Sequence, residues 1–227
     1  MFNYKLANGR MNVVHNIIGS ETTMARRSDH SREELTEMAL AASARIVAKK
    51  GSQALTARAV AAAIGYSPGT LYLVFHNLDD LIFHLNARTL DELGEKLYEA
   101  ATWAEGPGET LRVLARAYIR FARDNPHRWN LVFTHHLADT ETAPAFYQSR
   151  VDTLFSGVEE VLAPLGAGSL AHAASSARAL WGGVHGICAL GLNGKLRLAG
   201  GVSMESLADI LVNNFLTGYM HGHDQAT

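Results

Sequence analysis

The sequence predicts an all-α protein, and three observations support this fold class. Apolar residues recur every three to four positions in one segment after another, which is the spacing of a helix face. No segment alternates apolar and polar residues convincingly over the length of a strand. Gly and Pro residues stand between the periodic segments and mark their ends. A hydrophobic content of 48% with 19% charged residues indicates a folded globular chain.

The first three expected helices have recognisable start signals. Residues 1–23 show no sustained periodicity, and we expect a flexible extension there. A helix is expected over 31–50, with Ser31 and Glu34 as a capping box and Gly51 ending it. Thr56 is expected to cap a second helix over 56–63. A third follows over 67–75, with Pro68 tolerated in its first turn.

Asn77 and Asp80 are placed to begin a long fourth helix, which "EGPG" at 105–108 ends. Further helices are expected over 109–124, 127–138, 145–162, 170–198 and 203–221, giving about nine in all. The longest uncharged stretch, from Ala179 to Gly194, is shorter than the roughly 18 residues of a membrane span. We therefore expect a buried helix there and no membrane partner.

The stretch "TARAVAAAIGYSPGTLYLVF" places two short helices on either side of Gly65-Tyr66-Ser67-Pro68, which is the pattern of a helix-turn-helix. The second helix of such a motif can enter the major groove of DNA. Leu71, Val74 and Phe75 are expected to face the core. The residues left facing outward are Ser67, Pro68, Gly69, Thr70, Tyr72, Leu73 and His76.

Charge is distributed unevenly along the chain. Residues 24–78 carry seven basic and four acidic side chains, whereas residues 79–227 carry eleven basic and seventeen acidic ones. Only the segment with the helix-turn-helix pattern would therefore attract a polyanion. The lone Cys188 excludes an internal disulfide framework, and it favours a reducing, cytoplasmic location.

"LTARAVAAAIGYSPGTLYLVF", with "AASARIVAKKG" before it and "HNLDDL" after it, resembles the DNA-binding domain of the tetracycline-repressor-like (TetR/AcrR) family. The matching positions are Gly51, Thr56, Arg58, Ala61, Gly65, Ser67, Gly69, Leu71, Tyr72 and Phe75. The resemblance implies a DNA-binding domain over 24–78 and a ligand-binding and dimerisation domain over 79–227. "ALWGGVHGICALGLNGKL" is similar to the Trp-His-Gly signature of one class of the family's C-terminal domains.

By this resemblance, Thr56, Arg58, Thr70 and Tyr72 occupy the DNA-contacting places of the family. Leu78 stands where the family usually has a phosphate-binding Lys. The remaining phosphate contacts are then expected from helix N-terminal amides and from nearby basic side chains. These side chains are Arg26, Arg27, Lys49, Lys50 and His76.

The resemblance implies a non-enzymatic regulator without a cofactor. Its expected partners are a palindromic operator in double-stranded DNA, a second copy of the chain and a small-molecule effector. Release of the operator by the effector would make it a repressor, although a corepressor would obey the same thermodynamics.

Five glycines interrupt the helix expected over 170–198, and each costs roughly 1 kcal/mol relative to Ala. Gly182 and Gly186, four residues apart, would let another helix approach closely. The resemblance implies that this helix and the last one pair with their twins in a four-helix dimer interface. The last helix offers an apolar face of Leu207, Ile210, Leu211, Phe215 and Leu216.

Large apolar side chains with interleaved polar groups in the C-terminal half are typical of a ligand pocket. The candidate ligand contacts are Trp129, Phe133, Phe146, Tyr147, Trp181, His185 and Cys188. Each aromatic residue could equally be core filler, and His185 could equally be a hydrogen-bonded structural histidine.

Two other functions are open at this point. His135, His136 and Asp139 in "HHLAD" could bind a catalytic metal, although adjacent helix residues point about 100° apart. Leu78 also makes conceivable a small-molecule-binding protein that kept the fold and lost its operator.

Overall fold

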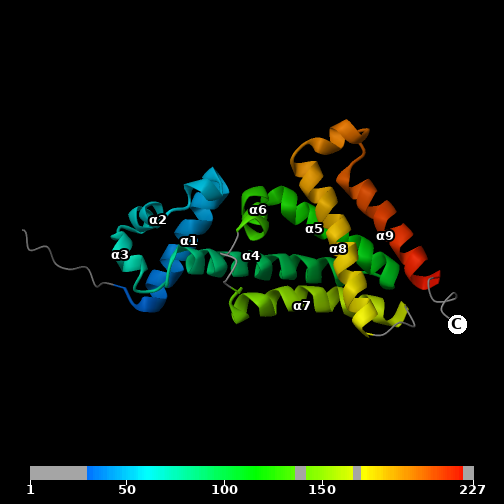
Figure 1. Cartoon of the computed structure of the whole chain (residues 1–227), viewed down its shortest axis with the longest axis horizontal. Helices are drawn as coiled ribbons and strands as arrows, with labels where there is room; N and C mark the ends of the chain where they lie inside the picture. Colours follow the sequence, from blue (N-terminus) through cyan, green and yellow to red (C-terminus); the bar gives the residue numbers. More distant parts are fainter. Residues whose placement is uncertain (1–29, 136–141, 166–169, 222–227) are drawn as a thin grey trace, which may run out of the picture.

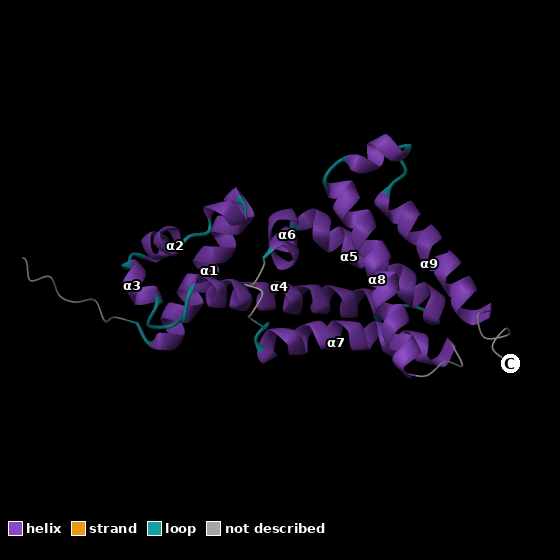
Figure 2. Ribbon diagram, viewed as in Figure 1, coloured by secondary structure: helices purple, strands orange, loops and turns teal. Residues whose placement is uncertain are grey.

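The computed structural model describes residues 30–135, 142–165 and 170–221. These residues form nine α-helices, three short 3-10 helices and no strand (Figures 1 and 2). The all-α prediction is therefore confirmed. In this part of the chain no helix is long and apolar enough to cross a membrane.

The N-terminal helices begin at the caps that the sequence predicts. Helix α1 (Arg32–Lys50) has the Ser31–Glu34 capping box and ends at Gly51, whose φ is 77°. Helix α2 (Ala57–Ile64) is capped by Thr56, whose side-chain oxygen accepts a hydrogen bond from the Ala59 N–H at 3.1 Å. Helix α3 (Pro68–Leu71) is shorter than expected. Beyond it the chain continues as tight turns to Phe75, whose N–H still bonds to the Leu71 carbonyl.

The long helix α4 (Leu78–Ala101) connects the two ends of the molecule (Figure 1). Asn77 caps it by accepting a hydrogen bond from the Asp80 N–H at 2.7 Å. Leu81 and Leu85, near its start, belong to a core that α1, α2 and α3 share. Leu93, two turns later, belongs to the core of the C-terminal helices. One continuous helix is therefore part of both cores.

The C-terminal core is formed by the second half of α4 and five further helices. These are α5 (Pro107–Asp124), α6 (Pro126–Thr134), α7 (Ala145–Leu162), α8 (Leu170–Leu192) and α9 (Met204–His221). Helix α7 runs alongside α4, and α8 and α9 lie at the end of the molecule away from α2 and α3 (Figure 1).

Two of these helices end earlier than the sequence predicts. Helix α8 ends at Leu192 rather than at residue 198, because Gly194 adopts a left-handed conformation (φ 69°) and begins a 3-10 helix over Lys195–Ala199. Helix α6 ends at Thr134, and residues 136–138 of the helix expected there lie outside the described residues.

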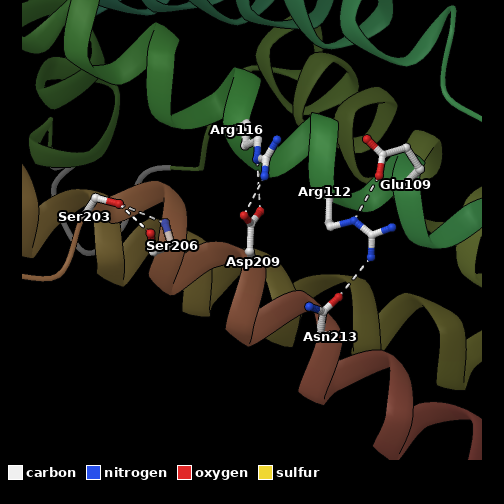
Figure 3. Close-up of polar contacts among 7 residues, drawn as sticks. All are labelled: Glu109, Arg112, Arg116, Ser203, Ser206, Asp209 and Asn213. Carbon is white, nitrogen blue, oxygen red and sulfur yellow. Dashed lines mark hydrogen bonds and ion pairs between the residues drawn. The ribbon is translucent and has the colours of Figure 1, made fainter.

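Three arginines of α5 hold α9 against the core, and Figure 3 shows two of them, Arg112 and Arg116. Arg116 donates two hydrogen bonds to Asp209, at 3.0 and 2.6 Å. Arg112 bridges Glu109 and Asn213, and Arg123 pairs with Glu205. These side chains are largely exposed to solvent, so each pair contributes about 1 kcal/mol or less. Their main effect is to fix the register of α9 on α5.

Candidate functional site

The turn between α2 and α3 is built around Gly65. Its φ of 79° and ψ of 24° lie in the left-handed region, which glycine adopts without strain. The Tyr66 N–H bonds to the Ala61 carbonyl at 2.9 Å, and the Gly65 N–H bonds to Ala62 at 3.3 Å. This pair of bonds is a Schellman motif, which ends α2 and redirects the chain at once into α3.

Leu71 and Phe75 are each 3% exposed, and Val74 packs against the same core, as the sequence predicts. On the opposite side, Tyr72 is 52% and Leu73 67% exposed. Ser67, Pro68, Gly69 and His76 are also exposed, and Thr70 is half-buried. The packing of α3 on the N-terminal core thus places one row of outward-facing side chains on the surface.

The polar groups of this surface are partly organised. The Ser67 and Thr70 hydroxyl oxygens lie 3.1 Å apart. Arg58 is exposed on α2, and Lys49 and Lys50 are exposed at the end of α1. Within the described chain none of these three cations has an ion-pair partner, so each is available to a phosphate. We define the DNA-facing surface as Lys49, Lys50, Thr56, Arg58, residues 67–70, Tyr72, Leu73 and His76.

Leu78 is the first residue of α4, and its half-buried side chain packs against the N-terminal core. It therefore makes an apolar contact inside the protomer at the place where the family usually has a cation. Arg26 and Arg27, the cations expected to compensate, lie outside the described residues.

A cavity of about 190 Å³ lies between the C-terminal helices. Nineteen residues of α4 to α9 line it: Leu90, Leu93, Leu97, Leu111, Leu114, Ala115, Tyr118, Val132, Phe133, Tyr147, Val151, Leu154, Phe155, Val158, Ala177, Leu180, Trp181, Val184 and Val212. The only lining side chains with a polar atom are Tyr118, Tyr147 and Trp181. None of the nineteen is charged.

Of the seven candidate ligand contacts, Phe133, Tyr147 and Trp181 line the cavity. The other four lie behind the wall or beside it. Trp129 is 5% exposed and Cys188 is fully buried, both within the C-terminal core. Phe146 turns away to stack on His84, and the two ring centroids are 4.4 Å apart.

His185 is also absent from the lining, and it lies behind three lining residues, Tyr118, Phe133 and Trp181. Its Nδ1 lies 2.9 Å from the Tyr118 hydroxyl, and its ring packs against Trp129, Phe133 and Trp181. Burial lowers the pKa of His185, and burial raises the pKa of Tyr118. Both groups are therefore neutral near pH 7, and the described residues that line the cavity carry no charge.

Tyr118 is a cavity-lining residue that the sequence analysis did not include among the candidate ligand contacts. It is a buried residue of α5. Only the packing of α5 against α8 shows that its hydroxyl meets His185, 67 residues away in the sequence.

Cys188 lies too deep in the core to act as a nucleophile. Burial raises the pKa of its thiol to about 12, so the reactive thiolate is scarce near neutral pH. Cys188 is therefore a core thiol and not a ligand contact.

The first turn of α7 touches α4 just after the N-terminal helices. Tyr147, a cavity residue, packs edge-on against Phe83 with centroids 5.2 Å apart. Phe146 stacks on His84, whose ring in turn meets Phe75 at 5.8 Å. His84 also lies 3.5 Å from Asp80, whose carboxylate accepts a hydrogen bond from the His76 N–H. A continuous row of contacts therefore joins the cavity to the end of the DNA-facing surface.

The glycines of α8 divide into two groups. A Cβ on Gly183 would lie 2.6 Å from Leu211, and one on Gly191 would lie 2.2 Å from Met204, so both permit the close approach of α9. A Cβ on Gly182 or Gly186 would meet nothing within 4 Å. The described part of the protomer therefore gives no packing reason for these two glycines.

The residues of the metal hypothesis can be placed only in part. His136 and Asp139 lie outside the described residues, and His135 Nε2 lies 3.5 Å from Asp79. In the described ranges no group of three or more His, Cys, Asp or Glu side chains is arranged to hold a metal.

The fold, the DNA-facing surface and the cavity define a class of protein. This class is the helix-turn-helix regulators, which join a DNA-binding domain to a helical domain that contains a cavity. Two family models match the chain. "Bacterial regulatory proteins, tetR family" matches residues 39–85, and "Tetracyclin repressor-like, C-terminal domain" matches residues 111–215. The chain belongs to the TetR family of bacterial regulatory proteins, as the sequence resemblance predicted. Neither description mentions a Trp-His-Gly signature, so that detail stays a prediction.

Solved structures share the fold at low sequence identity. A protein of unknown function from Rhodococcus sp. RHA1 is 20% identical with a TM-score of 0.70, covering 86% of this chain and all of that one. A TetR-family transcriptional regulator from Streptomyces coelicolor is 18% identical with a TM-score of 0.63, covering 83% and 97%. AibR, in complex with isovaleryl coenzyme A and operator DNA, is 20% identical with a TM-score of 0.55, covering 80% and 97%. No curated protein matches the sequence significantly.

The chain is thus a DNA-binding regulator by its family and fold. The matched domains are those of regulators rather than of enzymes.

Proposed function

We propose that this protein is a cytoplasmic repressor that binds a near-palindromic operator as a homodimer and leaves it when a small molecule fills the cavity. The observation that carries the proposal is the DNA-facing surface. It combines a tight Schellman turn, an outward row of polar and aromatic side chains on α3, and three cations, Lys49, Lys50 and Arg58, that form no ion pair with the described residues. The acidic remainder of the chain would repel DNA, so the duplex can approach from this side only.

The roles within this surface follow from geometry. Ser67, Pro68, Gly69 and Thr70 lie at the start of α3, where a recognition helix meets base edges. The Thr70 methyl suits a thymine methyl group, and the Tyr72 phenol suits a phosphate. Arg58, Lys49 and Lys50 add sequence-independent attraction to the backbone. Gly69 has no Cβ, so the backbone at this position can come close to the groove.

Gly182 and Gly186 support the homodimer. Each helix-interior glycine costs about 1 kcal/mol relative to Ala, yet neither is required by a neighbour within the protomer. Close approach of α8 from a second copy would give both a use. On α9, Ile210 is 54% exposed and would extend the same apolar contact, whereas Leu211 and Leu216 are occupied inside the protomer. Leu207, Leu211 and Phe215 are half-buried, so they can contribute at most their outer edges.

Ligand response is supported by the row of contacts from the cavity to α3. A molecule that displaces Tyr147 would move the first turn of α7, including Phe146 and its stack on His84. Phe75 and Asp80 contact the same histidine, so the residues that follow α3 would shift when His84 shifts. A ligand that binds the shifted arrangement better reduces the population able to bind DNA. The structural neighbour AibR was solved with both an acyl-coenzyme A and operator DNA, so the fold can hold both kinds of partner.

The test is selection of genomic fragments by the purified protein, followed by affinity measurements at several salt concentrations. We expect a specific site and a steep loss of affinity with salt, because phosphate contacts release counterions. The Tyr72→Ala variant should bind this site more weakly by about 1 kcal/mol or more. Tyr98→Ala, which removes a 78% exposed tyrosine from α4, is the matched control and should bind normally.

A protein that ignores every genomic fragment at low salt would contradict the proposal. That result, together with ligand binding, would favour the alternative of a small-molecule-binding protein that has lost its operator. The apolar position of Leu78 is the observation that favours this alternative.

A further inference from the structure

We infer that the effector is an uncharged, predominantly apolar molecule with a hydroxyl, carbonyl or ether oxygen that meets Tyr118. This inference deepens the proposed function, since it names the chemical class that the cavity would take. It rests on the composition of the cavity wall and on the hydrogen bond between Tyr118 and His185.

The wall excludes charged groups. Sixteen of the nineteen lining side chains are purely aliphatic or phenyl, and none is ionisable near neutral pH. A carboxylate, phosphate or ammonium group inside would lose its hydration without an opposite charge or a set of donors to replace it. That loss is among the largest penalties in protein interiors, so an ion should be bound far less well than its neutral analogue.

The arginines of neighbouring helices do not change this conclusion, because none of them is among the lining residues. Arg112 of α5 bonds to Asn213 of α9, and Arg116 of α5 pairs with Asp209 of α9. Arg150 of α7 pairs with Asp91 of α4, and Arg178 of α8 pairs with Glu159. The positive charge of the C-terminal helices is therefore held away from the ligand.

The polar contact available to a ligand is adaptable. A neutral imidazole has one N–H and one bare nitrogen. If His185 Nδ1 is the bare nitrogen, Tyr118 donates to it and offers oxygen lone pairs to the cavity. If Nδ1 carries the proton, Tyr118 accepts from it and can donate to a ligand oxygen. The Tyr118–His185 pair can thus serve either a hydroxyl or a carbonyl group, but it cannot neutralise an ion.

Tyr147 offers a second neutral contact. Its hydroxyl has no hydrogen-bond partner among the described residues, and burial raises its pKa, so it remains protonated. A molecule long enough to span from Tyr118 on α5 to Tyr147 on α7 would touch the residue that leads to Phe83 and α4. Tyr147 would then contact the ligand and also transmit its binding to α4.

The test compares three probes with the same eight-carbon chain: 1-octanol, octanoate and octylammonium. Isothermal titration calorimetry at pH 7.5, without DNA, measures each dissociation constant. We expect octanol to bind at least about tenfold more tightly than either ion, which corresponds to about 1.4 kcal/mol. Equal or tighter binding of octanoate or octylammonium would overturn the inference, as would a failure of octanol to bind.

Two variants locate the binding. Val151→Trp should fill the cavity and weaken octanol binding by at least about tenfold, the change expected from losing about 1.4 kcal/mol of contact. Thr153→Trp places the same side chain on the exposed face of α7 and should leave binding unchanged. Unchanged binding by Val151→Trp would show that octanol binds elsewhere, and this would overturn the inference.

Tyr118→Phe tests the polar contact itself. It should weaken octanol binding severalfold and leave the binding of the hydrocarbon octane unchanged, since only octanol has an oxygen to lose a partner. An equal effect on both probes would assign Tyr118 a packing role only. Because none of these measurements uses DNA, a protein that binds octanol but no operator would disprove the proposed function and leave the ligand class standing.

Discussion

Cys188 and His185 show how position rather than residue type determines chemistry. Both were candidates for ligand contact, and both lie in the layer of side chains behind the cavity wall. Cys188 is fully buried in the C-terminal core, and His185 lies behind the lining residues Tyr118, Phe133 and Trp181, with a hydrogen bond to the Tyr118 hydroxyl. A cysteine and a histidine that would be reactive on a surface are here a core thiol and a neutral hydrogen-bond partner.

Cys188 should therefore be unreactive in the folded protein. With its pKa raised to about 12, the thiol is almost entirely protonated at pH 8, and solvent cannot reach it. A thiol-specific chromogenic reagent should react slowly and incompletely with the native protein. In denaturant it should react rapidly with one thiol per chain. Rapid labelling of the native protein would contradict this burial.

Gly65 should be required for its backbone conformation. Gly65→Ala places a Cβ at a φ of 79° and should lower the free energy of unfolding by about 1 kcal/mol, measured by urea denaturation. Gly157→Ala is the control, since Gly157 lies inside α7 with nothing within 4 Å of an added Cβ. That change should stabilise the protein by up to about 1 kcal/mol. Equal effects at the two positions would show that the left-handed turn is not constraining.

The helix limits differ in how clearly the sequence marks them. The starts of α1, α2 and α4 could be predicted because Ser31, Thr56 and Asn77 cap amides only three residues away. The end of α8 could not be predicted, because its apolar pattern continues through Leu196 and Leu198 while Gly194 breaks the backbone.

The candidate pocket was predictable in kind but not in detail. Aromatic and polar residues in the C-terminal half indicate a cavity, yet the rotation of each helix about its axis decides which side chains line it. Phe146 and Tyr147 are neighbours in sequence, but only Tyr147 lines the cavity. Contacts such as Tyr118 with His185 join residues far apart in the chain, and no local pattern encodes them.

The first turn of α7 should carry the signal between the cavity and the DNA-facing surface. Phe146→Ala removes the stack on His84 without altering a cavity residue, so octanol binding should persist. The coupling free energy between octanol binding and operator binding should fall by about 0.5–2 kcal/mol in this variant. Operator affinity in the presence and absence of octanol, measured by fluorescence anisotropy, gives this coupling directly.

A double-mutant cycle with His84→Ala separates transmission from general destabilisation. If the stack carries the coupling, the double variant should be little worse than either single variant. Fully additive losses, or unchanged coupling in Phe146→Ala, would show that the signal takes another route.

Helix α4 links the cavity to the DNA-facing surface, because it contributes to both the N-terminal and the C-terminal core (Figure 1). Such an arrangement regulates DNA binding only if two copies hold their recognition segments at a fixed separation. The unexplained glycines of α8 lie at the opposite end from α3, where an interface would set that separation.

Gly186→Leu should therefore produce a monomer. A Cβ at this position meets nothing within 4 Å among the described residues, whereas a leucine side chain would prevent the close approach of a second α8. Loss of the second site should reduce operator affinity by about 10²-fold or more, since the gain from bivalent binding disappears. Gly157→Leu makes the same change on an exposed part of α7 and should remain dimeric. If sedimentation equilibrium shows that Gly186→Leu is a stable dimer, the interface lies elsewhere.

The most direct measurement is the symmetry of the DNA site selected from a random library. A two-fold dimer presenting two α3 segments predicts inverted half-sites whose centres are about 10–10.5 base pairs apart, or a multiple of that spacing. Selection of a single unrepeated half-site, or of direct repeats, would contradict the account of a symmetric pair of recognition segments.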